Sequence, residues 1–177
     1  MGKSVAGALW LDAGMTSPFD FYQYFVNVDD RDVARFLALL TFLPMDEVRR
    51  LGALQGADLR SAKETLALEV TTIVHGREAA DTARQAARAA FGAGASVGVA
   101  DDANVPSVKV AAGDRLVDVL AASGLAASKS IARRLIEQGG VRIGKSLVAD
   151  VAATIAPADL GLLLHVGKKH IRKLVGG

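Results

Sequence analysis

The sequence predicts two domains, an all-α helical bundle followed by a small domain of mixed α and β structure. Apolar residues recur at helical spacing from Ser17 to about Phe91. Residues 93–107 are rich in small and turn-forming residues and show neither helical nor strand periodicity. Beyond them, helical and strand patterns alternate. We therefore expect a helical domain over residues 12–92, a flexible linker over residues 93–107 and an α/β domain over residues 108–177, preceded by a short segment over residues 1–11.

The first helix has a clear start signal. Ser17 can cap the helix, Pro18 suits its first turn, and the Asp20 side chain can reach back towards the cap. Further along, two segments each place apolar residues on one helical face. These residues are Val33, Phe36, Leu37 and Leu40 in the first, and Ala62, Leu66, Val70, Ile73 and Val74 in the second. After a break at His75-Gly76, a stripe of alanines over residues 79–90 permits close approach between helices.

The second domain combines short helices with strands. The spacing predicts helices over residues 114–122 and 128–138, and Gly139-Gly140 ends the second of them. Strand-like runs follow over residues 141–143, 162–166 and 171–175. This alternation predicts the mixed α/β class.

Charge is distributed unevenly along a chain whose net charge is only +2. Residues 1–107 hold 10 Lys and Arg against 14 Asp and Glu, a net of −4, whereas residues 108–177 hold 11 against 5, a net of +6. The basic C-terminal domain is therefore the candidate for binding a polyanion.

Within that domain, the helix over residues 128–138 carries a basic face. Lys129 and Arg133 are four residues apart, Arg134 is adjacent, and Ile131 and Leu135 are predicted to face the core. A second basic cluster follows the strand over residues 162–166 and consists of Lys168, Lys169, His170, Arg172 and Lys173. If the fold brings the two clusters together, they form a surface for RNA phosphates. A solvated charged surface is the alternative.

The segment from Gly139 to Ser146 matches a phosphate-loop pattern, a glycine and four residues before Gly-Lys-Ser. A phosphate loop follows a strand and opens a helix, so that backbone N–H groups converge on the phosphates. Here a helix precedes the pattern and residues 141–143 resemble a strand, so we do not expect a nucleotide site.

Several classes of site and location are disfavoured. Cysteine is absent and only three histidines are present, so we expect no disulfide and no metal site. Charges or glycines interrupt every apolar run before it reaches membrane-spanning length, so we expect no membrane segment and a cytoplasmic location. Nothing near Trp10 or His75 supplies a catalytic partner, and both are expected to pack or cap.

A series of segments in the helical region carries a family signal. In order they are Met1-Gly-Lys-Ser4, Gly7-Ala-Leu-Trp-Leu-Asp12, residues 16–25, residues 27–33, Leu39-Leu-Thr-Phe42 and Glu69-Val-Thr-Thr-Ile-Val-His-Gly76. Taken together, these segments closely resemble bacterial-type tyrosyl-tRNA synthetases. In addition, residues 124–136 and Val166-Gly-Lys-Lys169 resemble the RNA-binding domain named after ribosomal small-subunit protein four, which ends these synthetases. The resemblance implies an anticodon-binding helical domain and a terminal tRNA-binding domain.

By this resemblance, the residues expected to bind tRNA are Ser128, Lys129, Arg133, Arg134, Lys168, Lys169 and Arg172. Lys129 stands where related domains often carry Arg, and it lacks the two-pronged donor geometry of a guanidinium. The family activates tyrosine with ATP, with Mg²⁺ expected alongside, and Lys3 and Ser4 are the remnant of its catalytic ATP-binding signature loop. There Lys3 would stabilise charge developing on the ATP phosphates, and Ser4 would support the loop.

Met1 occupies the place of an internal methionine of that loop, so we expect a fragment or a late-assigned start, without the catalytic nucleotide-binding domain. The family's homodimer contacts lie mainly in that domain, so the chain by itself could be monomeric and inactive in aminoacylation. A free-standing RNA-binding protein, regulatory or ribosome-associated, is the alternative, although the acidic helical domain argues against it. A purely structural helical protein would leave the basic domain unexplained.

Overall fold

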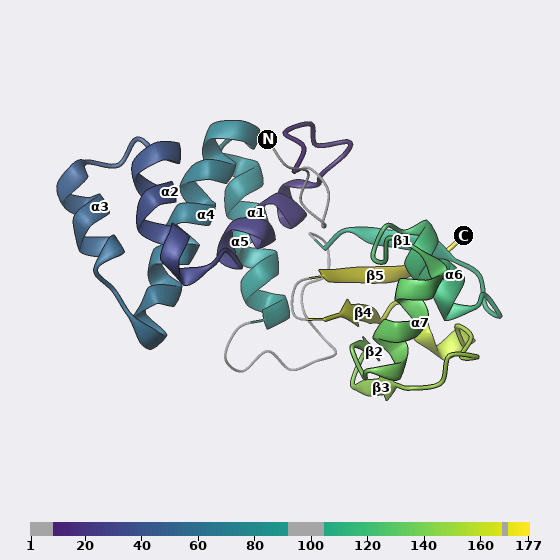
Figure 1. The fold of residues 1–177 in the computed structure, drawn as a ribbon. Coiled ribbons are helices and arrows are strands. Elements are labelled where there is room, and N and C mark those ends of the chain that lie inside the picture. Colours follow the sequence, from purple (N-terminus) through teal and green to yellow (C-terminus); the bar gives the residue numbers. More distant parts are fainter. Residues whose placement is uncertain (1–8, 92–104, 168–169) are drawn as a thin grey trace. The chain divides into compact units, whose positions relative to one another are not determined.

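The computed structural model describes residues 9–91, 105–167 and 170–177. The chain forms two compact units that divide between Ala87 and Arg88. The first unit is helical and the second combines helices with one sheet (Figure 1). The predicted order of an all-α part followed by a small α/β part is confirmed.

The helical unit contains five α-helices and two 3₁₀ turns among its described residues. In chain order these are α1 (Pro18–Val26), η1 (Asp30–Asp32), α2 (Val33–Leu40), α3 (Met45–Gly52), η2 (Gly56–Asp58), α4 (Leu59–His75) and α5 (Arg77–Phe91). Helix α1 packs most extensively against α4, and α2 packs against α3 and α4. Phe21, Tyr22, Leu37 and Leu66 are fully buried in the core of this unit.

Helix α1 begins as its sequence predicts. The Ser17 hydroxyl oxygen accepts a hydrogen bond from the Asp20 amide at 3.1 Å, and the same hydroxyl donates to the Asp20 carboxylate at 2.8 Å. Pro18 occupies the first turn, where no amide donor is needed. The cap thus satisfies a backbone N–H that the helix itself leaves unpaired.

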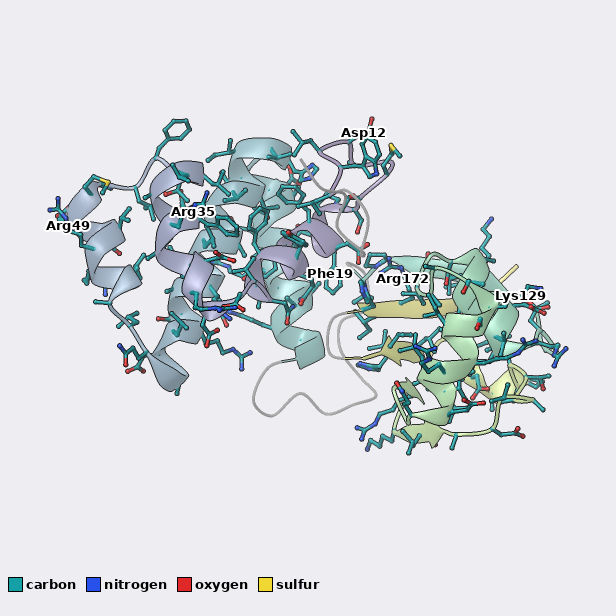
Figure 2. The ribbon with its side chains drawn as sticks, in the orientation of Figure 1. Asp12, Phe19, Arg35, Arg49, Lys129 and Arg172 are labelled. Atoms are coloured by element: carbon teal, nitrogen blue, oxygen red, sulfur yellow. The ribbon has the colours of Figure 1, made fainter. Side chains whose placement is uncertain are left out.

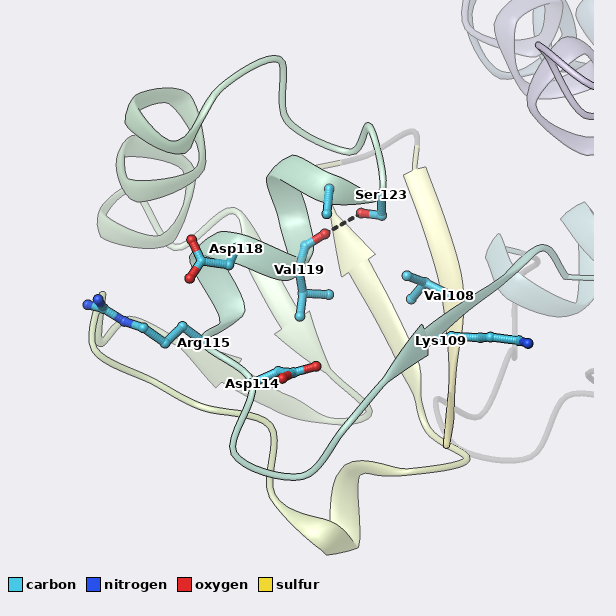
Figure 3. A pocket seen from close by; sticks show the side chains of 8 residues that line it. Val108, Lys109, Asp114, Arg115, Asp118, Val119 and Ser123 are labelled. Atoms are coloured by element: carbon cyan, nitrogen blue, oxygen red, sulfur yellow. Dashed lines mark hydrogen bonds between the residues drawn. The ribbon is translucent and has the colours of Figure 1, made fainter. Parts of the chain in front are cut away.

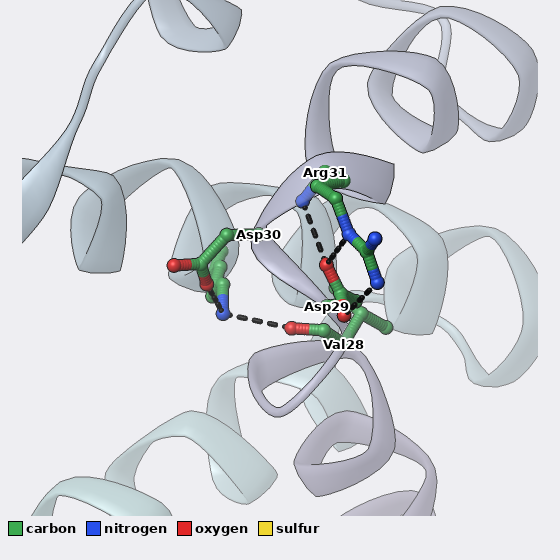
Figure 4. A network of polar contacts seen from close by, with 5 residues as sticks. Val28, Asp29, Asp30 and Arg31 are labelled. Carbon is green, nitrogen blue, oxygen red and sulfur yellow. Dashed lines mark hydrogen bonds and ion pairs between the residues drawn. The ribbon is translucent and has the colours of Figure 1, made fainter.

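The turn between α1 and α2 is attached to α4 by the side chain of Lys63 (Figure 4). Its ammonium donates to the Val28 carbonyl oxygen at 2.7 Å and pairs with the Asp30 carboxylate. In the same turn the Arg31 guanidinium donates to both carboxylate oxygens of Asp29, at 2.9 and 3.0 Å. These hydrogen bonds lower the pKa of Asp29 to about 2.

The predicted apolar faces are only partly correct. Leu40 at the end of α2 and Ile73 near the end of α4 are exposed, at 41% and 47%. In α4 the buried stripe instead runs through Ala62, Leu66 and Val70 and then shifts towards Thr71, which is fully buried although polar. The alanines at 80, 83, 86 and 87 of α5 are buried, as their spacing predicts.

The second unit is a five-stranded sheet covered on one face by two helices. Its elements are β1 (Ser107–Val110), α6 (Leu116–Ala122), α7 (Lys129–Glu137), β2 (Val141–Ile143), β3 (Ser146–Val148), η4 (Pro157–Asp159), β4 (Leu163–Val166) and β5 (His170–Gly176). The strand order is β1-β5-β4-β2-β3, in which only the β1–β5 pair is parallel. Leu116 and Leu120 of α6, Ile136 of α7 and Leu164 of β4 lie in its core.

Two strands were not predicted. Ser107, which we assigned to the linker, is the first residue of β1, and β3 follows the Gly144-Lys145 turn. Both are edge strands of three or four residues, too short to show a clear alternation. The rest of the predicted linker up to residue 104 lies outside the described residues.

Candidate nucleic-acid interface

Helix α7 carries four of the seven residues predicted to bind tRNA, counting its cap. Ser128 precedes the helix in an extended conformation, and its hydroxyl oxygen accepts a hydrogen bond from the Ile131 amide at 3.2 Å. Ser128 is thus the N-cap of α7, and the side chain is exposed. This cap fixes the start of α7, whose first residue is Lys129.

Lys129 forms an ion pair with a carboxylate from the neighbouring helix. Its ammonium lies 2.7 Å from Oδ1 of Asp118 in α6, and the two side chains are 64% and 46% exposed. The hydrogen bond from Lys129 lowers the pKa of Asp118, and the charges of Lys129, Arg115 and Arg133 lower it further. At neutral pH Asp118 is therefore an anion in a cationic environment.

Arg133 and Arg134 are both exposed on α7. Arg133 lies one turn after Lys129, so these two share a helical face as predicted. The prediction that Ile131 faces the core is wrong, because its side chain is 43% exposed. The core side is formed by Ala132 and Ile136, both fully buried, with Leu135 partly buried beside them.

Arg172 does not lie beside the α7 cations. It belongs to β5, where it pairs with Leu164 of β4, and its side chain is half-buried. Its guanidinium donates to the Ile171 carbonyl oxygen at 2.8 Å. Figure 2 shows Lys129 and Arg172 on different sides of the second unit. The other two predicted residues of this cluster, Lys168 and Lys169, lie outside the described residues.

The phosphate-loop pattern forms a β-hairpin. Residues 141–143 and 146–148 pair as antiparallel β2 and β3, and Gly144-Lys145 is the connecting turn. Gly144 has a φ of 55°, a conformation that glycine adopts without strain. No helix begins at this turn, so it lacks the helix N-terminus that a phosphate loop provides.

Two exposed arginines of the α/β domain were not among the predicted residues. Arg115 immediately precedes α6, and Arg142 stands in β2 opposite His165 of β4. Burial lowers the pKa of His165, and the charge of Arg142 lowers it further. Each arginine is a single cation, Arg115 just before α6 and Arg142 in a three-residue strand, so a search for charge clusters could not find them.

The predicted catalytic residues Lys3 and Ser4 lie outside the described residues. Trp10 is exposed, and its backbone amide donates to the Thr16 hydroxyl at 3.2 Å. His75 packs against Phe21. Among the described residues, no three potential ligand side chains gather in a way that could hold a metal ion. Within the same part of the chain, no helix is long and apolar enough to cross a membrane.

Comparison with known protein families divides the chain into the same two parts as the structure does. The family of tRNA synthetases class I (W and Y) matches residues 1–92, and the S4 domain family matches residues 105–160. The S4 match includes α6, α7 and the β2–β3 hairpin, and therefore includes Ser128, Lys129, Arg133 and Arg134.

Individual relatives extend the similarity over nearly the whole chain. The chain is 51% identical over 180 residues to a tyrosine–tRNA ligase of Clostridium botulinum (strain Alaska E43 / Type E3), covering 98% of this chain and 43% of the relative. The corresponding ligase of Fusobacterium nucleatum is 48% identical over 178 residues, covering 99% and 42%. The chain thus spans less than half the length of these relatives.

Among solved structures, the chain matches a C-terminally truncated mitochondrial tyrosyl-tRNA synthetase from Aspergillus nidulans with 38% sequence identity. The match covers 48% of this chain and 25% of that chain, and its TM-score is 0.45. The family assignment rests on the sequence match over residues 1–92, which is just over half of the chain. The chain belongs to the tRNA synthetases of class I (W and Y), and its curated relatives named above are tyrosine–tRNA ligases.

Proposed function

We propose that this chain is the tRNA-binding part of a tyrosine–tRNA ligase. The observation that carries the proposal is the exposed basic face of α7, with Lys129, Arg133 and Arg134, inside the stretch that matches the S4 domain. Lysine and arginine on such a face bind RNA by neutralising backbone phosphates. The RNA is tyrosine tRNA, because the relatives that match nearly the whole chain are tyrosine–tRNA ligases.

The two units would have different tasks. The basic unit would bind the tRNA through α7, with Lys168, Lys169 and Arg172 as further contacts, and Ser128 would cap the helix and line the same surface. The helical unit would approach the anticodon region, as its resemblance to the synthetases implies. The location that follows for such a protein is the cytoplasm, where tRNA is charged.

Catalysis would belong to the intact ligase. There Lys3 would stabilise the negative charge that develops on the pyrophosphate leaving group of ATP, and Ser4 would support the loop that carries it. Mg²⁺ would accompany ATP as a second source of positive charge. In an intact ligase, Lys3→Ala is therefore expected to slow tyrosine activation without weakening tRNA binding.

The salt dependence of tRNA binding tests the assignment of α7. Each phosphate contact contributes about 0.7 to 0.9 to the slope of log affinity against log salt concentration. Arg133→Ala should weaken binding of tyrosine tRNA at low salt and reduce that slope by about this amount. Arg142→Ala is the matched control, since Arg142 is an exposed arginine of the same unit that lies on β2 and not on α7. Equal effects of the two substitutions, or tRNA binding that salt does not weaken, would contradict the proposal.

A free-standing RNA-binding protein is the second candidate, favoured only by the fact that the basic unit forms a compact body by itself. Such a protein would bind tyrosine tRNA and an unrelated structured RNA equally well. Its helical unit would contribute nothing to affinity.

A further inference from the structure

The carboxylate of Asp118 in α6 lies near the charges of three cations, which are Lys129 and Arg133 of α7 and Arg115, the residue before α6. Lys129 of α7 contacts it directly at 2.7 Å. Arg115 precedes α6 by one residue, Arg133 lies one turn after Lys129, and the charges of both act on Asp118. The three cations carry a formal charge of +3, and Asp118 contributes one negative charge beside them.

This carboxylate is accessible to a ligand. Asp118 and Arg115 both line a hollow of about 360 Å³ between α6 and β1, whose apolar wall includes Val108 and Val119 (Figure 3). In Figure 3 the side chain of Asp118 on α6 and that of Arg115, just before α6, both point away from β1. Because the paired side chains of Lys129 and Asp118 are themselves 64% and 46% exposed, an anion that approaches Lys129 meets Asp118 as well.

A carboxylate and a phosphodiester offer cations the same kind of acceptor, an anionic oxygen that takes charge-assisted hydrogen bonds. An ion pair between side chains as exposed as those of Lys129 and Asp118 contributes little to stability. Exchange of the carboxylate for another anion therefore costs little. The same exposed Asp118 repels any phosphate that approaches Lys129, so it opposes RNA binding unless it is displaced.

We propose that Asp118 is a built-in counterion of the RNA site, which in the free protein occupies the anion position that a backbone phosphate of the RNA takes among Arg115, Lys129 and Arg133. This rests on the proposed function and deepens it. It adds Arg115 to the RNA-binding residues and makes Asp118 a positioning residue that holds Lys129 in place and weakens RNA binding.

The substitution Asp118→Asn tests the counterion role in the full 177-residue chain, with tyrosine tRNA as the probe. In the variant, Lys129 is neutralised by solution ions, which are released when phosphate binds. We expect the affinity of the Asp118→Asn variant for tyrosine tRNA to rise about two- to five-fold at low salt, because the RNA no longer has to displace an exposed ion pair. The slope of log affinity against log salt should steepen by up to about 0.9.

Glu137→Gln is the matched control. Glu137 is exposed at the other end of α7, so this substitution removes one negative charge from the same unit without touching the cluster. Its effect on affinity and slope should be clearly smaller. Arg115→Ala is the second test variant, and it should weaken binding several-fold and make the slope shallower by about 0.7 to 0.9. Thermal melts of all variants confirm that each is folded.

The outcomes separate this inference from the proposed function. If the wild-type chain binds tyrosine tRNA and Asp118→Asn behaves like Glu137→Gln, the counterion role is wrong and only net charge matters. If Asp118→Asn weakens binding, Asp118 supports the site and does not oppose it. If Arg115→Ala changes neither affinity nor slope, Arg115 is not a phosphate contact. Loss of the proposed function itself would appear as absence of salt-dependent binding in the wild-type chain.

Discussion

The imidazole of His75 meets the ring of Phe21 edge to face, with ring centroids 4.9 Å apart and planes at 87°. Its Nε2 atom is buried and has no hydrogen-bond partner among the described residues. Burial disfavours the imidazolium and lowers the pKa of His75 below its usual value of 6.5. At neutral pH the neutral form of His75 is therefore favoured at the end of α4.

This contact predicts that the helical unit loses stability on mild acidification. A histidine whose pKa is lower when folded takes up a proton more readily in the unfolded chain, so stability falls as pH drops through about 6.5. Chemical denaturation at about pH 7.5 and pH 5.5 measures the loss. His75→Phe keeps the ring contact and should reduce the dependence on pH. An unchanged dependence in that variant would show that His75 is not its source.

Gly52 is predicted to resist substitution by alanine because α2 and α3 approach closely there. A Cβ at Gly52 would lie 2.8 Å from the Cβ of Ala34. We expect Gly52→Ala to destabilise the helical unit by about 1 to 3 kcal/mol, as overpacking usually does. Urea denaturation gives the change in the free energy of unfolding.

The double variant Ala34→Gly/Gly52→Ala provides the control for this contact. It moves the methyl group from one helix to the other and removes the clash, so it should recover stability relative to Gly52→Ala alone. A Gly52→Ala variant that is more stable than the wild type, by the roughly 0.5 to 1 kcal/mol typical of glycine replacement within a helix, would refute the close approach.

Ser128 is predicted to have two separable roles, capping α7 and lining the RNA surface. Ser128→Ala should cost the second unit about 1 kcal/mol of stability through loss of the cap. Ser128→Asp should retain the cap, because aspartate also accepts the backbone hydrogen bond, but should place a negative charge beside Lys129. We expect this variant to melt like the wild type and to bind tyrosine tRNA more weakly. Binding equal to that of the wild type would place Ser128 outside the interface.

The helical part of the fold was largely predictable because its signals are local. The cap at Ser17, the proline after it and the alanine stripe of α5 act within a few residues. Which side of a helix is buried depends on the elements that pack against it. For this reason the predicted burial of Ile73 in α4 and of Ile131 in α7 was wrong. In α7 the small Ala132 lies on the core side, and the larger Ile131 does not.

The strand errors have a different cause. Strand β1 pairs with β5, which lies near the other end of the domain's sequence, so that Ser107 is opposite Lys173. The four residues of β1 are too few for any alternation of apolar and polar residues to reveal this pairing. Strand β3, which was not predicted, has only three residues and pairs with the predicted strand β2. Short strands are stabilised by distant partners that local sequence does not show.

For the candidate site, the sequence identified the cations of α7 but neither Arg115 nor the surroundings of these cations. Lys129, Arg133 and Arg134 are exposed on α7, as helical spacing predicts. The pairing of Lys129 with Asp118 joins residues on two helices, and only the fold brings them within 2.7 Å. The separation of Arg172 from Lys129 is likewise a result of sheet order, since β5 lies between β1 and β4.

The most direct test of the central claim compares binding of this chain to tyrosine tRNA and to an unrelated tRNA at two salt concentrations. Both affinities should fall as salt rises, because phosphate contacts supply much of the binding. If the chain is the tRNA-binding part of a tyrosine–tRNA ligase, it should bind tyrosine tRNA more tightly at both concentrations. Equal affinity for the two tRNAs would contradict that account and leave a general RNA-binding module.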